Sequence, residues 1–265
     1  MRQTTLLWLI VFFLTAAGSP TLAQIARPQV PRDAELLSDQ GVTYFKEGVE
    51  LHRAGRYREA IEAFERVVVL APGYATAYNN LGAAYLDAGL YSESLAHFRR
   101  AISLRPGYID AHRNLGLAHY GLARYEEAVA SYRQALRLRP DFVAAYNDLG
   151  MAYNHLGKYR EAIEAHRQAL LLDPLFADAY NNLGSVYVNM DQHRKAVDMF
   201  EHAIRLNPNL AEARFNLGVT YLALRDKPAA LEQYGLLQAL DSGLAKRLYL
   251  GIFGDKVLNV GRKRD

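Results

Sequence analysis

Histidine, carboxylate and amide side chains are the groups in this sequence that could do chemistry, and their spacing favours binding over catalysis. His112 and His119 lie seven residues apart on one predicted helix, but zinc needs a third ligand close by, and neither Asp110 nor His155 is a convincing one. The chain has no cysteine, which excludes thiolate nucleophiles, cysteine zinc ligands and disulfides. It also has no phosphate-binding loop, no Gly-x-Ser-x-Gly elbow and no His-Glu-x-x-His motif. We therefore expect no enzyme activity, no cofactor and no metal.

Asparagine recurs every 34 residues in two adjacent columns of the sequence. An amide offers two donors and an acceptor, so a ladder of amides stacked one above another could hold the backbone of an extended peptide. Each such bond contributes only about 0.5–1.5 kcal/mol, so specificity would have to come from other residues. The first column is Asn79, Arg113, Asn147 and Asn181, and the second is Asn80, Asn114, Asp148, Asn182 and Asn216.

The same period runs from Gly41 to Leu244 and defines six consecutive units, which are 41–74, 75–108, 109–142, 143–176, 177–210 and 211–244. When each unit is numbered from its first residue, position 8 is glycine in all six, position 20 is alanine or serine, and position 24 is Phe, Tyr or His. A fixed period of this length indicates a stacked array, in which each unit buries its apolar face on its neighbours.

Each unit contains two segments with helical periodicity. In the second unit, apolar or small residues such as Ala77, Leu81 and Tyr85 form a wide helical stripe. A glycine such as Gly55 or Gly89 follows the first segment, and glycine suits a left-handed helix cap because it has no Cβ. Proline at position 32 ends the second segment in the first five units. The pattern predicts a helix-turn-helix in every unit.

These columns resemble the tetratricopeptide repeat. The resemblance covers residues 41–244 and implies an all-α fold, a right-handed α-solenoid of six stacked repeats, followed by a capping helix and tail at 245–265. The two end units depart from the pattern, as Glu47 and Leu51 do in the first. In the unit from Ala75, the matching residues are Tyr78, Leu81, Gly82, Tyr85, Ser94, Phe98, Ala101 and Pro106.

The resemblance also implies a binding surface. In such repeats the first helix of each pair lines a concave groove, where positions 2, 5, 9, 12 and 13 commonly face a peptide and position 6 does so in some long arrays. Two interpretations of position 6 stay open, namely ligand contact and hydrogen bonding within the repeat. The basic set that grips a C-terminal carboxylate in some members is absent. The predicted peptide-binding residues are Asn79, Asn80, Asp110, Arg113, Asn114, Asn147, Asp148, Asn181, Asn182, Glu212 and Asn216.

The first residues predict export from the cytoplasm. Arg2 precedes an apolar run over 6–14, and small residues before Gln24 fit a signal peptide of residues 1–23 that is cleaved after Ala23. The alternative is an uncleaved anchor, although the run is short for a membrane span of about 20 residues. Residues 24–40 are predicted to be a linker and an N-terminal extension of the first helix, with its cap at Asp33. Either alternative places the repeats in the periplasm or outside the cell.

Charge and composition limit the choice of partner. The net charge of +3 is weak and forms no concentrated basic face in the sequence, so we expect no nucleic acid partner, and no small-molecule substrate is implied. Arginines on the second helices are interspersed with acids, which is typical of a solvated face, so only weak association with a membrane surface is open. We expect a non-catalytic scaffold or adaptor that binds an extended segment of another protein. The alternative is a structural protein that self-assembles through its terminal or convex faces.

Overall fold

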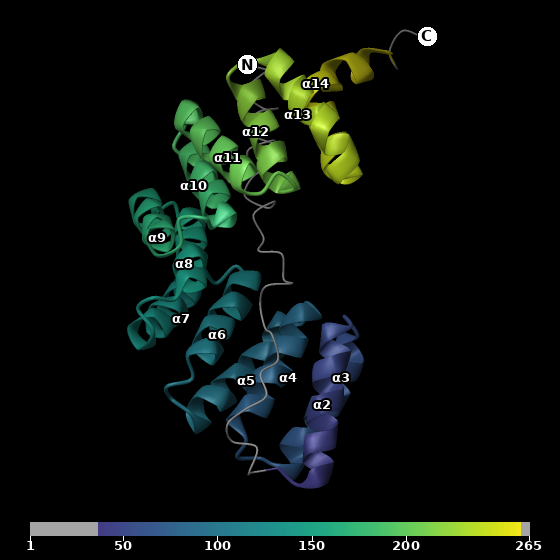
Figure 1. Cartoon of the computed structure of the whole chain (residues 1–265), viewed down its shortest axis with the longest axis vertical. Helices are drawn as coiled ribbons and strands as arrows, with labels where there is room; N and C mark the ends of the chain where they lie inside the picture. The colour runs from purple at the N-terminus through teal and green to yellow at the C-terminus, as the bar shows by residue number, and fades with distance from the viewer. Residues whose placement is uncertain (1–36, 261–265) are drawn as a thin grey trace. The chain divides into compact units, whose positions relative to one another are not determined.

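The computed structural model describes residues 37–260, which form an all-α helical-repeat solenoid of helical hairpins (Figure 1). No strand occurs within this range. The chain divides between Leu156 and Gly157 into two compact units. Inside each unit, every hairpin packs on the next one along the chain.

The N-terminal unit contains three complete hairpins and the first helix of a fourth. Its helices are α2 (Asp39–Arg53), α3 (Tyr57–Leu70), α4 (Ala75–Asp87), α5 (Tyr91–Leu104), α6 (Ile109–Gly121), α7 (Tyr125–Leu138) and α8 (Val143–His155). The C-terminal unit contains α9 (Tyr159–Leu172), α10 (Ala177–Asn189), α11 (His193–Leu206), α12 (Ala211–Ala223), α13 (Lys227–Leu240) and α14 (Ser242–Val260).

The first described helix begins with a side-chain cap. The Ser38 hydroxyl accepts a hydrogen bond from the Gly41 amide at 3.2 Å and so satisfies one of the free donors at the start of α2. The cap predicted at Asp33 and the predicted signal peptide both lie outside the described residues. In the part that is described, no helix has the length and apolar character needed to cross a membrane.

The turn inside each hairpin depends on one left-handed residue. Gly55, Gly89 and Gly157 have φ values of +73°, +78° and +69°, which confirms the predicted glycine caps. The equivalent residues of the other three hairpins keep positive φ without being glycine. These are Ala123, Asp191 and Arg225, at +56°, +60° and +62°. The turn geometry is therefore retained where the sequence signal for it is lost.

Inside a hairpin, the two helices are held together by the contact of a glycine with an aromatic ring. A Cβ added to Gly82 would lie 2.7 Å from the ring of Phe98, and one added to Gly48 would lie 2.7 Å from the ring of Phe64. Both rings are fully buried. Glycine at position 8 thus allows the aromatic side chain at position 24 to lie directly against the first helix.

At two junctions between neighbouring hairpins, a tyrosine donates a hydrogen bond to a glutamate. Tyr85 of α4 donates to Glu65 of α3 at 2.9 Å, and Tyr221 of α12 donates to Glu201 of α11 at 3.0 Å. Burial, with the nearby carboxylate, raises the pKa of Tyr221 to about 12. The tyrosine at position 11 therefore joins the first helix of one hairpin to the second helix of the preceding one.

The array ends on α14, which packs against both α12 and α13. The helix continues through Gly251 and Gly254 to Val260, within the segment predicted to hold a capping helix and tail. Its Leu248 side chain is almost fully buried. A Cβ on Gly218 would lie 2.6 Å from Leu248, so α14 fills the space above the last position-8 glycine.

Candidate binding surface on the first helices

The structure places the eleven predicted residues on the first helices α4, α6, α8, α10 and α12. Only Asp110, Asn182 and Glu212 are partly exposed. The remaining eight are buried, and they are Asn79, Asn80, Arg113, Asn114, Asn147, Asp148, Asn181 and Asn216. The polar columns are thus mostly inside the protein.

The buried residues of the two columns bond to one another across neighbouring hairpins. Asn114 Nδ2 donates to Asn79 Oδ1 at 3.1 Å, which joins α6 to α4. Asn216 Nδ2 donates to Asn181 Oδ1 at 3.0 Å, which joins α12 to α10. In both cases position 6 of one hairpin contacts position 5 of the hairpin before it. The hydrogen bonds therefore run between repeats, whereas the sequence analysis considered bonds within a repeat.

The third link in this series is ionic. Arg113 Nε on α6 donates to Asp148 Oδ2 on α8 at 2.6 Å, and the two side chains are 10% and 3% exposed. Burial raises the pKa of Asp148 above its ordinary value, and the guanidinium of Arg113 opposes that rise. We call these three pairs, Asn79–Asn114, Arg113–Asp148 and Asn181–Asn216, the inter-hairpin links.

A second ion pair stands beside the ionic link. Arg139, at the end of α7, contacts Asp110 at 3.2 Å, so this predicted groove acid already has a partner. The ring of Phe142 lies between the two arginines, with its centroid 3.6 Å from the Arg139 guanidinium and 5.6 Å from that of Arg113. Two cations over one ring hold its position by cation–π attraction. The charges of this region are thus largely compensated inside the protein.

Asn80 shows what happens when the partner of a link is absent. It lies 35 residues after Phe45, which occupies position 5 of the first hairpin and cannot accept a hydrogen bond. The Nδ2 atom of Asn80 is buried without a hydrogen-bond partner. A buried donor in this state costs about 1–3 kcal/mol. The link needs polar residues at both positions, and here the second hairpin supplies Asn80 while the first hairpin has only Phe45.

One further polar contact between neighbouring hairpins was not predicted from the sequence. His52 Nε2 on α2 lies 2.9 Å from Asp87 Oδ2 on α4, and each side chain is 6% exposed. The two residues are 35 positions apart, like the members of the inter-hairpin links. A search for polar pairs 35 residues apart would have found this contact. Comparing residues 34 apart, at the repeat period, only aligns each residue with the equivalent residue of the next unit.

Apolar side chains lie next to the links on the first helices. At position 9 these are Ala83, Leu117, Met151 and Val219, all of them buried. Asn147 Nδ2 lies 3.9 Å from Met151 Sδ one turn along α8. The polar columns are therefore interleaved with buried apolar side chains. Partly exposed polar residues occur at position 2 (Asp110, Asp178, Glu212) and position 6 (Asn182), and also at position 9 (Ser185), position 12 (Asn154) and position 13 (His155, Asn189).

Two histidines that could have served as metal ligands are instead packed in the core. His112 and His119 on α6 are buried, and a ring nitrogen of His112 lies 2.9 Å from the Pro106 carbonyl oxygen. Burial lowers the pKa of His119, which favours the neutral ring. No group of three or more His, Asp or Glu side chains in the described range is arranged to hold a metal ion.

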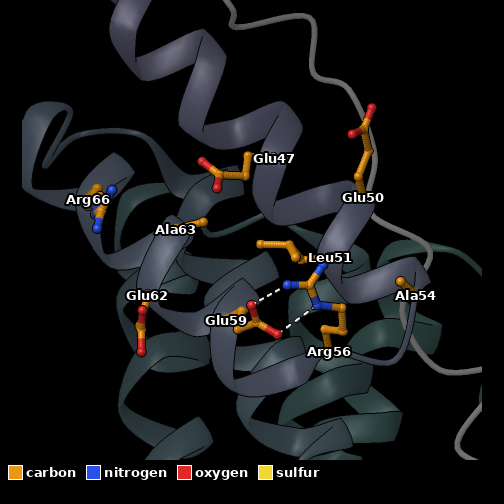
Figure 2. Close-up of a pocket in the computed structure, with 9 residues that line it drawn as sticks. All are labelled: Glu47, Glu50, Leu51, Ala54, Arg56, Glu59, Glu62, Ala63 and Arg66. Carbon is orange, nitrogen blue, oxygen red and sulfur yellow. Dashed lines mark hydrogen bonds and ion pairs between the residues drawn. The ribbon is translucent and has the colours of Figure 1, made fainter.

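A separate hollow lies at the N-terminal end of the array, between α2 and α3 (Figure 2). Its volume is about 470 Å³, and Leu51 lies among charged side chains. Arg56 bonds to Glu59 there through Nε at 2.6 Å, with both side chains more than half exposed. The hollow is therefore a polar, solvated end surface. Its acidic residues are Glu47, Glu50, Glu59 and Glu62.

Hairpins of two helices that recur at a fixed period and close on a glycine–aromatic contact define a helical-repeat protein. Family models described as tetratricopeptide repeat match residues 45–109 and, in two overlapping segments, 141–208 and 175–240. A model described as TPR repeat matches 124–156. The chain belongs to the tetratricopeptide repeat family, as its columns had suggested.

Known structures of the same architecture resemble this chain at low sequence identity. PilW, a type IV pilus biogenesis factor, matches with a TM-score of 0.70 and 22% identity over 77% of this chain and 94% of its own. MamA from Desulfovibrio magneticus RS-1 matches with a TM-score of 0.59 and 23% identity, over 65% of this chain and 98% of its own. A chain of the APC/C hetero-tetramer Cut9–Hcn1 matches with a TM-score of 0.69 and 20% identity, over 90% of this chain and 48% of its own. A search of curated proteins finds no match. These similarities establish the fold alone.

Proposed function

We propose that this protein is a non-catalytic interaction scaffold that holds an extended segment of a partner protein against the first helices of its hairpins. The observation that supports this is the set of inter-hairpin links, which hold neighbouring first helices at a fixed separation. Side chains one repeat apart then present the same face at regular intervals, and an extended chain is a ligand of matching periodicity. The fold similarity to known repeat proteins is consistent with a binding role.

The ligand contacts are assigned to the partly exposed residues rather than to the links. Position 2 carries Asp178 and Glu212 and position 6 carries Asn182, all of them partly exposed, whereas Asp110 at position 2 already pairs with Arg139. Carboxylates accept hydrogen bonds from backbone amides and pair with basic side chains. The expected ligand is an extended segment with lysine or arginine. The buried members of the predicted site, such as Asn79 and Asp148, support the surface from below.

Photo-crosslinking from defined positions tests this assignment. A photoreactive phenylalanine analogue would replace Ala144 and Glu212, which are partly exposed on α8 and α12, or Arg133 and Arg167, which are exposed on α7 and α9. We expect both first-helix positions to label one partner and the two second-helix positions to label none. The labelled segment, made as a synthetic peptide, should then bind the purified protein. Labelling only from the second helices would contradict the proposal.

We also propose that the scaffold works in the cell envelope or outside the cell. The support is the signal peptide that the sequence predicts for residues 1–23, and PilW, which shares the fold, is itself a pilus biogenesis factor. Measuring the mass of the protein recovered from the periplasm or medium tests both export and signal cleavage, because cleavage after Ala23 gives a chain that begins at Gln24. Recovery of the whole chain from the cytoplasm alone would refute export, and recovery of the uncut chain from membranes would favour the anchor.

A further inference from the structure

The C-terminal end of the array lacks the charged residues that other hairpins carry on their second helices. Positions 25 and 26 are Gly235 and Leu236 in α13. The equivalent pairs earlier in the chain are Glu65–Arg66, Arg99–Arg100, Arg133–Gln134, Arg167–Gln168 and Glu201–His202. The last unit of an array normally has a polar outer face, because nothing follows to cover it. This end is therefore unlike a finished cap.

Helix α14 also changes the role of the last aromatic residue at position 24. In three other hairpins this residue, Phe64, Phe98 or Phe200, is fully buried against its glycine. Here Leu248 lies over Gly218 instead, and Tyr234 is only partly buried. The Tyr234 ring lies 5.6 Å from the ring of Tyr249 on α14.

These rings continue into a cluster at the end of the molecule. The Tyr249 ring lies 4.8 Å from that of Phe253. Lys227 donates from Nζ to the Ile252 carbonyl at 2.9 Å, and its ammonium is 4.5 Å from the centre of the Phe253 ring. We use the name C-terminal apolar patch for the exposed or partly exposed apolar residues of α13 and α14 that include these rings, namely Leu231, Tyr234, Tyr249, Leu250 and Phe253.

The exposed fractions show that this patch is uncovered on one side. Leu231 and Tyr249 are each 38% exposed and Leu250 is 47% exposed. On the opposite side of α14, Leu248 and Ile252 are buried against the array. A helix that is apolar on both sides is normally covered on both sides. Among the side chains that the structure describes, those that cover α14 lie on only one of these two sides.

We propose that the C-terminal apolar patch binds the same patch of a second copy, in a two-fold symmetric dimer. From Asp226 to Gly254 the chain has three basic and three acidic residues, so two copies meet here without net repulsion. The basic residues are Lys227, Lys246 and Arg247, and the acidic ones are Asp226, Glu232 and Asp241. A contact between identical patches uses up the patch on both copies, so assembly stops at a dimer.

The other end of the array does not suit this patch. The hollow between α2 and α3 is lined by Glu47, Glu50, Glu59 and Glu62 (Figure 2). Arg56, which pairs with Glu59, and Arg66 also line it. An apolar surface placed over the hollow would remove these charged groups from water without supplying new partners for them, which is unfavourable. A head-to-tail contact would also leave an open end on every added copy and so build chains rather than dimers. The second copy therefore docks tail to tail.

Sedimentation of the mature chain tests the dimer, with substitutions inside and outside the patch. Five side chains are fewer than a standard interface of about 800 Å² per partner uses, so the mass should be followed up to roughly 100 µM. Leu250→Glu should weaken dimerisation at least about tenfold. The matched control is Leu175→Glu, which changes a leucine that is 74% exposed outside the patch and should dimerise like the unchanged chain.

Cysteine crosslinking adds a test of the symmetry, because the chain has no cysteine of its own. Under mild oxidation, Leu250→Cys or Phe253→Cys should give a covalent dimer, and Leu175→Cys should stay monomeric. A monomer throughout the concentration range, assembly beyond two copies, or equal crosslinking from all three positions would overturn the proposal. A circular dichroism spectrum that matches the unchanged chain shows that each variant is folded.

Discussion

Replacing the ionic link by the amide link of its neighbours tests whether the polar ladder is structural. Arg113→Asn with Asp148→Asn creates the pair found at Asn79–Asn114, at the same spacing and between equivalent helices. If the role of the link is to join α6 to α8, the amide pair should join these helices and preserve most of the stability. The single substitutions, in contrast, should be harmful.

The expected magnitudes follow from burial. Asp148→Ala leaves the Arg113 guanidinium, 10% exposed, without its carboxylate, and breaking a buried pair in this way costs about 3–5 kcal/mol. Arg113→Ala should cost less, because the pKa of Asp148 is already raised by burial and the freed carboxyl can take up a proton. The double variant loses the contact of Arg113 with Phe142, about 0.5–1 kcal/mol, and should stay within about 2 kcal/mol of the unchanged protein.

Hydrogen exchange combined with thermal unfolding provides the assay. Repeat arrays can unfold in steps, so the amides of α6 and α8 should be followed separately from those of α12 and α13. We expect Asp148→Ala to speed exchange in α6 and α8 and the double variant to restore most of the protection. The reasoning fails if Asp148→Ala leaves exchange unchanged, or if the double variant is less stable than both single ones.

Four other substitutions test the packing and the turn geometry. His166 is fully buried with neither ring nitrogen hydrogen-bonded, and burial lowers its pKa from 6.5 to about 3. Between these pH values the unfolded chain binds a proton that the folded chain does not, so the free energy of unfolding should fall as the pH drops below 6.5, by about 2 kcal/mol at pH 5. His166→Phe should remove this loss in melting curves. Gly82→Ala should cost about 1–3 kcal/mol because its Cβ meets Phe98, whereas Gly235→Ala, with nothing within 4 Å, should stabilise. Ala123→Gly should raise stability in urea unfolding by about 1 kcal/mol, because the φ of +56° strains alanine; a lower urea midpoint would contradict this.

The architecture could be read from the sequence because each hairpin repeats the same local solution. Glycine at position 8, an aromatic at position 24 and glycine in the turn are short-range requirements of one helix pair, and Gly82, Phe98 and Gly89 meet them in sequence order. Regularity over six units then confirmed the period. The signal was weaker in the turns at Asp191 and Arg225, where the backbone keeps its left-handed geometry without glycine.

The binding residues were harder to predict, because their environment depends on contacts between hairpins. Asn79 and Asn114 stand in neighbouring columns, and only the stacking of α4 on α6 shows that they bond to each other. Residue type alone suggested exposed amides that could hold a peptide. The stacking also buries Leu117 and Met151 beside the links, and so interleaves the polar columns with buried apolar side chains.

The arrangement of links and exposed acids separates two kinds of variant. Removing a member of a link, such as Asn114, releases one first helix from its neighbour, so stability and ligand affinity should fall together. Removing Glu212, which is partly exposed at position 2 of α12, leaves the links in place and should reduce affinity with little change in unfolding. Affinity losses at Asn114 but not at Glu212 would mean that the links support a surface other than the one proposed. A loss at Glu212 with unchanged stability can arise only if the ligand reaches the first helices themselves.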